Sequence, residues 1–413
     1  MARGSDAQGV SRGVTELASD AVAARIDELL ARRAAATEAF FGPEAERIAA
    51  LCLAMAERFA AGGRLVAVGL SAQARSDVRH VTVEFVHPVI VGKRALPALG
   101  LSREGGSLFD QVELLVEHGD IAIAFGSEPE VAEALAAAGR RGALTIAFGN
   151  DAEWSFEVPG DDPDVHQELA ETLYHVLWEL VHVFFEHPGL LTGREDRRSH
   201  DTGASSFLYP FLAESETDPE PVLADVRRSV LLKADEAGAL RERTLRDGRA
   251  ELAAAAVALR SCFDAGGKLL ALGNGGSATD AMDLVADLRE PLGDRSPRRA
   301  LDLTEDPAVL TAIANDIGPG AIFQRQVIAH GRPGDALVAL STSGNSENVI
   351  EALAEARRRE LTTVALVGYD GGSIASQRLA QHVVVTPSEH IPRIQEAQAT
   401  AYHALTDLIE GER

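Results

Sequence analysis

The sequence predicts an α/β protein with two domains, each an αβα sandwich around a parallel sheet. Each half of the 413-residue chain alternates short apolar runs with amphipathic helical stretches. This alternation is typical of a parallel sheet that helices cover on both faces. At roughly 100–200 residues per domain, the length suggests two or three domains. The expected strands are Leu65–Val68, Ile121–Phe125 and Leu144–Phe148 in the first half, and Leu269–Leu272, Ala336–Leu340 and Thr363–Val367 in the second.

An internal repeat supports the two-domain prediction. Phe59–Gly69 matches Phe263–Gly273, and both segments contain a helix end, a Gly-Gly turn and a buried strand. Gly119 and Asp120 match Gly334 and Asp335 in the same way. The repeat ends on two pairs with the same internal spacing, which are Gln167 with Gln395 and His175 with His403. A repeat of this length indicates two copies of one fold.

The composition along the chain divides it into four expected segments. We expect a disordered N-terminus at 1–20, a first domain at 21–187, a linker at 188–220 and a second domain at 221–413. The linker is rich in Gly, Ser, Asp, Pro and Arg, which is typical of a connecting segment.

Charge and cysteine content exclude several classes of function. The net charge of −24 repels nucleic acid and anionic membranes. Cys52 and Cys262 are too few for a disulfide scaffold or a Cys-rich zinc module, so a metal site must use His, Asp, Glu or Gln. The N-terminus has no apolar signal segment, and no apolar run approaches the roughly 18 residues of a membrane span. We therefore expect a soluble cytoplasmic protein.

Two loops in the second half are suited to phosphate. Residues 273–277 (GNGGS) follow an expected strand and open a helix, where backbone N–H groups can bind an anion. Residues 341–346 (STSGNS) stand at a second strand-to-helix junction and carry four hydroxyl groups. Such loops at the carboxyl edge of one parallel sheet predict a phosphorylated ligand. The alternatives are a tight turn for the first loop and helix capping for the serines.

The second half resembles the sedoheptulose 7-phosphate isomerases, or phosphoheptose isomerases, of the sugar isomerase (SIS) superfamily. The resemblance covers about residues 240–410 and rests on GNGGSATDAM (273–282), LTAIANDIG (310–318), RPGDALVALSTSGNSENVIEAL (332–353), GYDGGSIA (368–375) and RIQE (393–396). It implies a flavodoxin-like SIS domain here, and the repeat then makes the first half a diverged second SIS domain.

The resemblance also implies substrate contacts. These contacts are Asn274, Gly275, Gly276 and Ser277 in the first loop, Asn315 and Asp316, then Ser341, Thr342, Ser343 and Ser346 in the second loop, and Gln395. A turn is the alternative for Asn315 and Asp316.

The family binds a divalent metal through a His and a Glu four residues apart, together with a Gln and a His of the last helix. In the second half Asp283 and Asp287 stand at the first two positions, with Gln395 and His403 at the others. The resemblance implies that these four could hold Zn²⁺, whereas the alternative for the aspartates is a solvated helix face.

The first half keeps the metal residues and has lost the ligand loops. His80 and Glu84 are four residues apart, and Gln167 and His175 complete an alternative metal set. In place of the phosphate loops stand LSAQ (70–73) and FGSEPE (125–130). A salt bridge or a core histidine is the alternative reading. The complementary losses suggest a composite site at a junction of the two halves.

The expected function is aldose–ketose isomerisation of a sugar phosphate, an intramolecular oxidoreductase reaction. The resemblance implies conversion of sedoheptulose 7-phosphate to D-glycero-D-manno-heptose 7-phosphate through a metal-assisted enediolate. Asp287 or Glu84 would remove the proton, and His403 or His175 would relay it. The alternatives are another ketose phosphate, or a non-catalytic phosphosugar-binding regulatory or assembly protein. Since the family is tetrameric, we expect a homodimer of two-domain chains.

Overall fold

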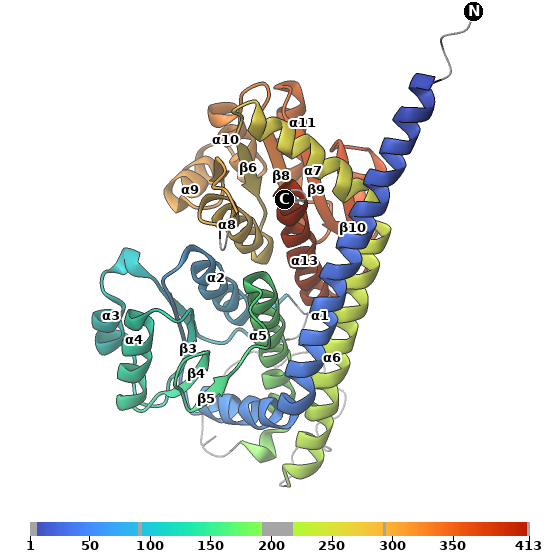
Figure 1. Cartoon of the computed structure of the whole chain (residues 1–413). Helices are drawn as coiled ribbons and strands as arrows, with labels where there is room; N and C mark the ends of the chain where they lie inside the picture. Colours follow the sequence, from blue (N-terminus) through green and yellow to red (C-terminus); the bar gives the residue numbers. More distant parts are fainter. Residues whose placement is uncertain (1–5, 90–92, 192–217, 292–294, 411–413) are drawn as a thin grey trace, which may run out of the picture. The chain divides into compact units, whose positions relative to one another are not determined.

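The computed structural model describes residues 6–89, 93–191, 218–291 and 295–410, which form two compact units (Figure 1). The N-terminal unit comprises Ala36–Ala237. The C-terminal unit comprises Gly238–Arg413 together with Met1–Ala35. The boundaries fall inside two long helices, α1 (Asp6–Ala60) and α6 (Glu220–Asp247).

The N-terminal unit is built on a five-stranded parallel sheet with the order β2-β1-β3-β4-β5. Its strands are β1 (Leu65–Gly69), β2 (Ala98–Leu101), β3 (Ile121–Phe125), β4 (Leu144–Phe148) and β5 (Trp154–Phe156). Its helices, besides parts of α1 and α6, are α2 (Ala72–Val86), α3 (Leu108–Leu115), α4 (Pro129–Arg140) and α5 (Pro163–Phe185), with 3₁₀ turns at Arg103–Gly105 and Pro188–Leu190.

The C-terminal unit is built on a second five-stranded parallel sheet with the order β10-β9-β8-β6-β7. Its strands are β6 (Leu269–Leu272), β7 (Ala300–Asp302), β8 (Ala336–Ser341), β9 (Thr362–Gly368) and β10 (His382–Thr386). Its helices are α7 (Arg249–Asp264), α8 (Gly276–Arg289), α9 (Pro307–Asp316), α10 (Ile322–His330), α11 (Glu347–Arg358), α12 (Gly372–Ser376) and α13 (Ile391–Glu410), with a 3₁₀ turn at Pro319–Ala321.

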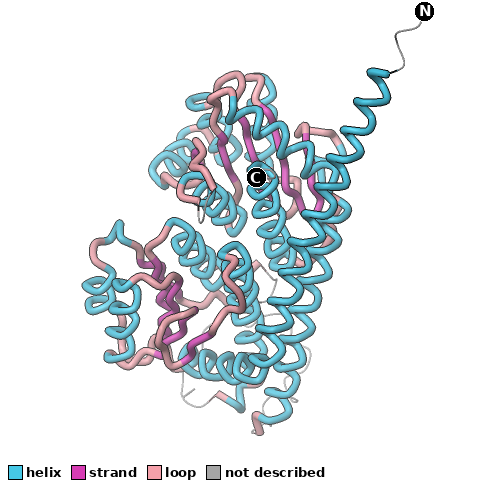
Figure 2. The backbone as a smooth tube through the Cα atoms, in the orientation of Figure 1, coloured by secondary structure: helices cyan, strands magenta, loops and turns pink. Residues whose placement is uncertain are grey.

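The two sheets have the same topology. In each, the first strand along the chain lies between the second and the third, and the fourth and fifth follow on the side of the third. This order is that of the flavodoxin-like doubly wound fold. The strands of both sheets are flanked by helices (Figure 2). The predicted α/β class with two parallel sheets is therefore confirmed.

Both faces of each sheet are buried, as all-parallel sheets require. On β1, Leu65 and Ala67 pack in one apolar cluster with residues of α1, α2 and α5, while Val66 and Val68 pack in another with α3 and α4. The C-terminal sheet repeats this division, since alternate residues of β6 enter clusters with α7, α8 and α13 or with α10 and α11. Successive side chains of a strand point to opposite faces, which explains the alternation.

A buried carboxylate ties two loops together at the same place in each unit. Asp120 accepts hydrogen bonds from the backbone N–H of Arg64 at 2.8 Å and of Glu117 at 2.9 Å, and it pairs with the Arg64 guanidinium. Asp335 accepts from the N–H groups of Lys268 and Arg332, both at 3.0 Å, and pairs with the Lys268 ammonium. The sequence repeat is thus also a repeat of contacts.

The unit boundaries differ from those expected from composition. Helix α1 starts at Asp6, inside the segment 1–20 expected to be disordered, and Ile26, Leu29 and Leu30 of this helix lie in the core of the C-terminal unit. Their spacing places them on one helix face, which explains why they pack there. Of the expected linker 188–220, residues 192–217 lie outside the described residues. Among the residues that the structure describes, no helix is long and apolar enough to cross a membrane.

Candidate active site

The first phosphate loop of the C-terminal unit connects β6 to α8. A Cβ atom at Gly273 would lie 2.1 Å from the carbonyl oxygen of Ser277, so only glycine fits there. The N–H of Ser277 donates to the carbonyl of Asn274 at 3.0 Å, which closes the turn directly before the helix. The loop thereby brings the chain onto the N-terminus of α8, where backbone N–H groups favour an anion.

The second loop connects β8 to α11. Its hydroxyl groups shape the turn, because Gly344 donates its N–H to Ser341 Oγ at 3.1 Å and Asn345 donates to Ser343 Oγ at 3.2 Å. Ser346 stands at the N-cap position of α11, yet its side chain makes no capping hydrogen bond to the part of the chain that the structure describes. The Ser346 hydroxyl is therefore not committed to capping. Thr342 is half-buried beside these serines.

The two loops lie at one edge of the sheet and are joined to each other. Strands β6 and β8 are neighbours, so their carboxyl ends meet at the same edge. Asn274 of the first loop and Asn348 in the first turn of α11 exchange two amide hydrogen bonds, each of 2.9 Å. A phosphate-sized anion at this edge would face both loops, as expected for ligands of doubly wound folds.

A buried polar centre lies between α8 and α13 of the same unit. His403 Nε2 lies 3.4 Å from Asp283 Oδ2 and 3.5 Å from Asp287 Oδ2. The side chains are 2%, 1% and 6% exposed, so the solvated acidic face considered for the two aspartates is not what the structure has. Gln395, also buried, lies on α13 about two turns before His403. The structure thus brings Asp283, Asp287 and His403 of this predicted set together.

Two further observations complete the C-terminal site. Tyr402 donates its hydroxyl to Asp283 Oδ2 at 2.7 Å, a contact that was not predicted from the sequence, where Tyr402 precedes His403 as Tyr174 precedes His175. Asn315 and Asp316 form the exposed end of α9 and hydrogen-bond to each other at 2.8 Å. They therefore end a helix, and none of the hydrogen bonds described for them joins them to the phosphate loops.

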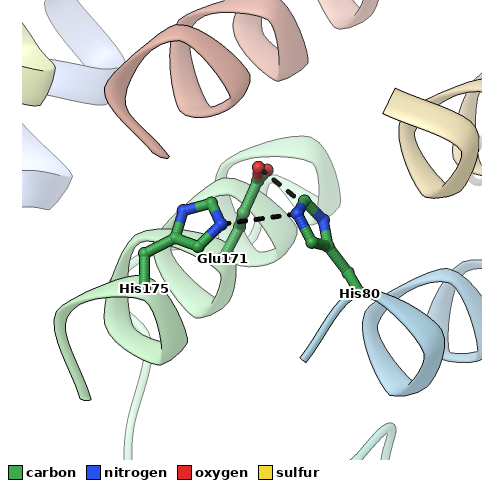
Figure 3. A group of neighbouring side chains, drawn as sticks. All are labelled: His80, Glu171 and His175. Atoms are coloured by element: carbon green, nitrogen blue, oxygen red, sulfur yellow. Dashed lines mark hydrogen bonds and ion pairs between the residues drawn. The ribbon is translucent and has the colours of Figure 1, made fainter. Parts of the chain in front are cut away.

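The N-terminal unit has its own buried centre between α2 and α5 (Figure 3). His80 Nε2 lies 3.4 Å from His175 Nε2, and His80 Nδ1 lies 4.0 Å from Glu171 Oε1. One ligand atom from each of the three residues falls within 4.8 Å of the others. Glu171 was not among the expected residues. It stands four positions before His175, so helical spacing puts both on one face of α5.

The other two members of the set predicted in this unit behave differently. Glu84 Oε1 lies 4.0 Å from His80 Nε2, whereas the amide of Gln167 donates to Asp77 at 3.3 Å. Burial, with the charge of nearby Glu179, raises the pKa of Glu84 to about 8. Burial, with nearby His175, holds the pKa of His80 well below its ordinary value, so this imidazole is neutral at pH 7.

The loops of the N-terminal unit are closed by a carboxylate of the chain itself. Glu128 stands at the N-cap position of α4, which corresponds to the position of Ser346 at α11. Glu128 Oε1 accepts a hydrogen bond from the backbone N–H of Ser71, at the start of α2, at 3.1 Å. In this unit, the N–H group of Ser71 thus already donates a hydrogen bond to a carboxylate of the chain, at the place where a bound phosphate would need it. The sequence showed the loss of the serine loop but not this replacement.

Comparisons with known proteins agree with the fold and the loops. The SIS domain family matches residues 234–368. The phosphoheptose isomerase of Citrifermentans bemidjiense is 49% identical over 152 residues, which are 36% of this chain and 78% of that protein. The phosphoheptose isomerase of Rhodospirillum rubrum is 44% identical over 160 residues, or 38% of this chain and 84% of that protein.

One solved structure extends the likeness of the fold over both units. The tagatose-6-phosphate ketose/aldose isomerase of Escherichia coli aligns with a TM-score of 0.54 at 12% identity, over 93% of this chain and 92% of that chain. This alignment shows a common fold for both halves, while the SIS family match covers residues 234–368, which contain the loops 273–277 and 341–346. Through that unit, the chain belongs to the phosphoheptose isomerase family of SIS-domain proteins.

Proposed function

We propose that the chain is an aldose–ketose isomerase that converts sedoheptulose 7-phosphate to D-glycero-D-manno-heptose 7-phosphate. The observation that carries this proposal is the geometry of α8. Its N-terminus belongs to the phosphate loop, and Asp283 and Asp287 on the same helix converge with His403 in a buried centre. Membership in the phosphoheptose isomerase family supports the choice of substrate.

The phosphate would be held by the two joined loops. The N–H groups at the start of α8, the Ser277 hydroxyl and the Ser346 hydroxyl, which makes no capping hydrogen bond, would supply the donors for it. Gln395, Asn315 and Asp316 are proposed to bind the hydroxyl groups of the open-chain sugar. A ligand with one dianionic end and a polyhydroxy chain fits this combination of donors.

The proton transfer is assigned to Asp287 and His403. In the ketose, Asp287 would remove a proton from the carbon next to the carbonyl, and the electron pair would form the enediolate double bond. A proton returned to the former carbonyl carbon, with loss of the proton on the terminal oxygen, gives the aldose. His403, whose Nε2 lies 3.5 Å from Asp287 Oδ2, would relay protons between these positions.

The residues of this centre also fit a divalent metal, which we propose to be Zn²⁺. Ligands around a tetrahedral zinc with bonds of 2.0–2.1 Å are about 3.3 Å apart. The distances of 3.4 Å and 3.5 Å from His403 to the two carboxylates are close to this value. A bound divalent ion would stabilise the developing oxyanion and acidify the neighbouring C–H group. Tyr402 would orient Asp283 through its hydrogen bond.

A second candidate function is non-catalytic binding of a phosphosugar, by a regulatory or assembly protein. The observation that favours it is the pair of short side chains, since Asp283 and Asp287 stand where the resembled family has a His and a Glu. A homodimer of the chain belongs to the proposal in either case, and light scattering of the purified protein measures it.

Two variants separate the candidates. Asp287→Asn and His403→Ala should each lower kcat for sedoheptulose 7-phosphate by at least 100-fold, while calorimetric binding of the sugar phosphate stays within a few-fold of the unmodified chain. Loss of turnover with retained binding supports the proton-transfer roles. Unchanged kcat in both variants would remove the assignment, and binding without turnover in the unmodified chain would favour the second candidate.

A further inference from the structure

The segment from the end of β9 to the first turn of α12 is joined to the second phosphate loop, residues 341–346. Asn345 Oδ1 of this loop accepts hydrogen bonds from the backbone N–H of Ser373 at 2.9 Å and from the Ser373 hydroxyl at 2.8 Å. The N–H of Ile374 donates to the carbonyl oxygen of Gly344 at 3.1 Å. The chain after β9 therefore takes part in fixing the position of the loop.

Gly368, the last residue of β9, is in contact with this loop and with helix α13. A Cβ atom at Gly368 would lie 2.3 Å from the carbonyl oxygen of Thr342 and 2.7 Å from Cγ2 of Ile394. Both distances are too short for a Cβ atom, so only glycine fits between the two elements. Thr342 belongs to the phosphate loop, and Ile394 lies in the first turn of α13, directly before Gln395.

The residue after Gly368 is hydrogen-bonded to the segment that precedes α13. Tyr369 has a φ of +53°, in the left-handed region that residues other than glycine seldom adopt. Its N–H donates to the carbonyl oxygen of Ser388 at 3.2 Å. The N–H of His390 donates to Ser388 Oγ at 3.1 Å, and α13 begins at the next residue, Ile391. The end of β9 thus holds the start of α13 through a hydrogen bond as well as through packing.

In the proposed reaction, different elements hold the two ends of the substrate. The phosphate is assigned to the two loops, whereas Gln395 and His403, which are assigned to the sugar and to proton transfer, stand on α13. The rate of a reaction depends on the alignment of the reacting groups, and a misplacement of about 1 Å can lower it by about 100-fold. The contact that fixes α13 relative to the second phosphate loop therefore bears on turnover.

We propose that Gly368 is a positioning residue that sets the separation between the second phosphate loop and α13, and thereby the reach from the bound phosphate to Gln395 and His403. This role rests on the proposed isomerase function. A side chain at position 368 would displace the loop through Thr342 and α13 through Ile394. The two displacements are separable, because the side chain of Ile394 can be shortened, whereas a backbone carbonyl cannot be removed.

Substitutions on both sides of the contact test this role. Gly368→Ala should lower kcat for sedoheptulose 7-phosphate by about 100-fold, because the loop and α13 must both move. Ile394→Ala loosens the contact and should lower kcat by about 5-fold, with unchanged calorimetric affinity for inorganic phosphate. The double variant should regain about 10-fold of the kcat lost in Gly368→Ala, since the new Cβ atom then has room beside α13. Its affinity for inorganic phosphate should stay as low as in Gly368→Ala, because the carbonyl of Thr342 is still crowded.

Gly267→Ala is the matched control. A Cβ atom at Gly267 would lie 2.6 Å from the carbonyl oxygen of Gly334 and 2.7 Å from Sγ of Cys262, so the crowding is similar. This glycine precedes β6 and therefore lies at the amino edge of the sheet, away from the phosphate loops. We expect unchanged kcat and unchanged phosphate affinity in Gly267→Ala. An equal loss of kcat in Gly267→Ala and Gly368→Ala, or losses that multiply in the double variant, would overturn the proposal.

A second readout does not require turnover. In NMR spectra of protein with isotope-labelled histidine, the signal of the His403 imidazole is assigned by its absence in His403→Ala. This signal should shift in Gly368→Ala and in Ile394→Ala, return toward its original position in the double variant, and stay unchanged in Gly267→Ala. Where Gly368→Ala does not fold, Ile394→Ala decides, and an unchanged His403 signal in this variant overturns the proposal. Failure of the unmodified chain to isomerise the sugar would overturn the proposed function and leave this readout in place.

Discussion

The backbone N–H of Ser71 donates a hydrogen bond to Oε1 of Glu128 at 3.1 Å, and this contact joins the two loops of the N-terminal unit that correspond to the phosphate loops of the C-terminal unit. A carboxylate from the chain thus takes the place of a bound anion. In the C-terminal unit the corresponding N-cap residue is Ser346, whose hydroxyl caps nothing in the described part of α11. The two units therefore differ in whether a carboxylate of the chain holds a backbone N–H group between these loops.

Substitution of Ser346 tests this difference between the two units. Ser346→Glu should place a carboxylate in the phosphate position, where charge repulsion weakens binding of sedoheptulose 7-phosphate at least 100-fold, or about 2.7 kcal/mol. Ser346→Ala removes one hydroxyl only and should weaken binding roughly 10-fold, or about 1.4 kcal/mol. Isothermal titration calorimetry measures both. Glu128→Ser changes the N-terminal unit alone and should leave the affinity of the C-terminal loops for the sugar phosphate unchanged. Two bound molecules in the unmodified chain would contradict the closure of the N-terminal loops.

The backbone of the first loop gives a second prediction. Gly273→Ala would place a Cβ atom 2.1 Å from the carbonyl oxygen of Ser277, so the turn before α8 must move. We expect phosphate binding to fall at least 10-fold in calorimetry. The control is Gly238→Ala within α6, where a Cβ atom meets nothing within 4 Å and alanine should stabilise the helix by about 0.5–1 kcal/mol. Equal binding by both variants would show that the loop does not hold the phosphate.

The hydrogen bond from Tyr402 to Asp283 gives a third prediction. Tyr402→Phe removes the donor that orients this carboxylate, so metal affinity of the C-terminal centre and kcat should each fall by about 10-fold. Tyr174→Phe changes the corresponding residue of the N-terminal unit and should leave kcat unchanged. Competition with a chromophoric chelator measures the affinity, and steady-state kinetics measures kcat. Equal effects of the two substitutions on kcat would argue that Tyr402 acts only through general packing.

The pKa of Asp120 predicts how stability depends on pH. Burial acts to raise this pKa, but hydrogen bonds from Arg64 and from the N–H groups of Glu117 and Arg64 outweigh burial and lower it. A carboxyl with a lowered folded-state pKa stabilises the fold above its unfolded pKa of about 4, and the contribution is lost as pH falls through the folded value. Asp120→Asn should therefore cost about 1–3 kcal/mol at pH 7.

Urea unfolding followed by tryptophan fluorescence measures this loss in the free energy of unfolding of the N-terminal unit, which contains both tryptophans. The difference between the unmodified chain and Asp120→Asn should shrink as the pH falls from about 4 toward 2. A difference that stays constant over this range would mean that the Asp120 charge is not what stabilises the loop.

Much of the fold could be predicted from sequence because its signals are local. Buried runs such as Ile121–Phe125 and the Gly-Gly turns placed the central strands, and the repeat placed the same strands twice. The edge strands of both sheets were not predicted; they are Ala98–Leu101, Trp154–Phe156, Ala300–Asp302 and His382–Thr386. The first three have only three or four residues, and edge strands are often short.

The residues of the candidate site could be predicted only where they are contiguous in the sequence. The loops at 273–277 and 341–346 are contiguous motifs, and the structure joins them. Glu171 and Glu128 could not be predicted in this way, because their partners lie far away in the sequence. Glu171 lies near His80 of α2, and Glu128 accepts a hydrogen bond from Ser71 of the other loop. Their one local signal is spacing: Glu171 precedes His175 by one helical turn, and Glu128 takes the N-cap position of Ser346.

The isomerisation reaction itself is the most direct test of the proposed function. Metal-replete protein is incubated with sedoheptulose 7-phosphate in D₂O, and the sugar is followed by NMR. We expect a new aldose phosphate signal together with deuterium on the carbon that was the carbonyl of the ketose, because the proton removed to form the enediolate exchanges with solvent before a proton is returned. Saturable binding of the sugar phosphate with neither product nor deuterium uptake would contradict the isomerase assignment.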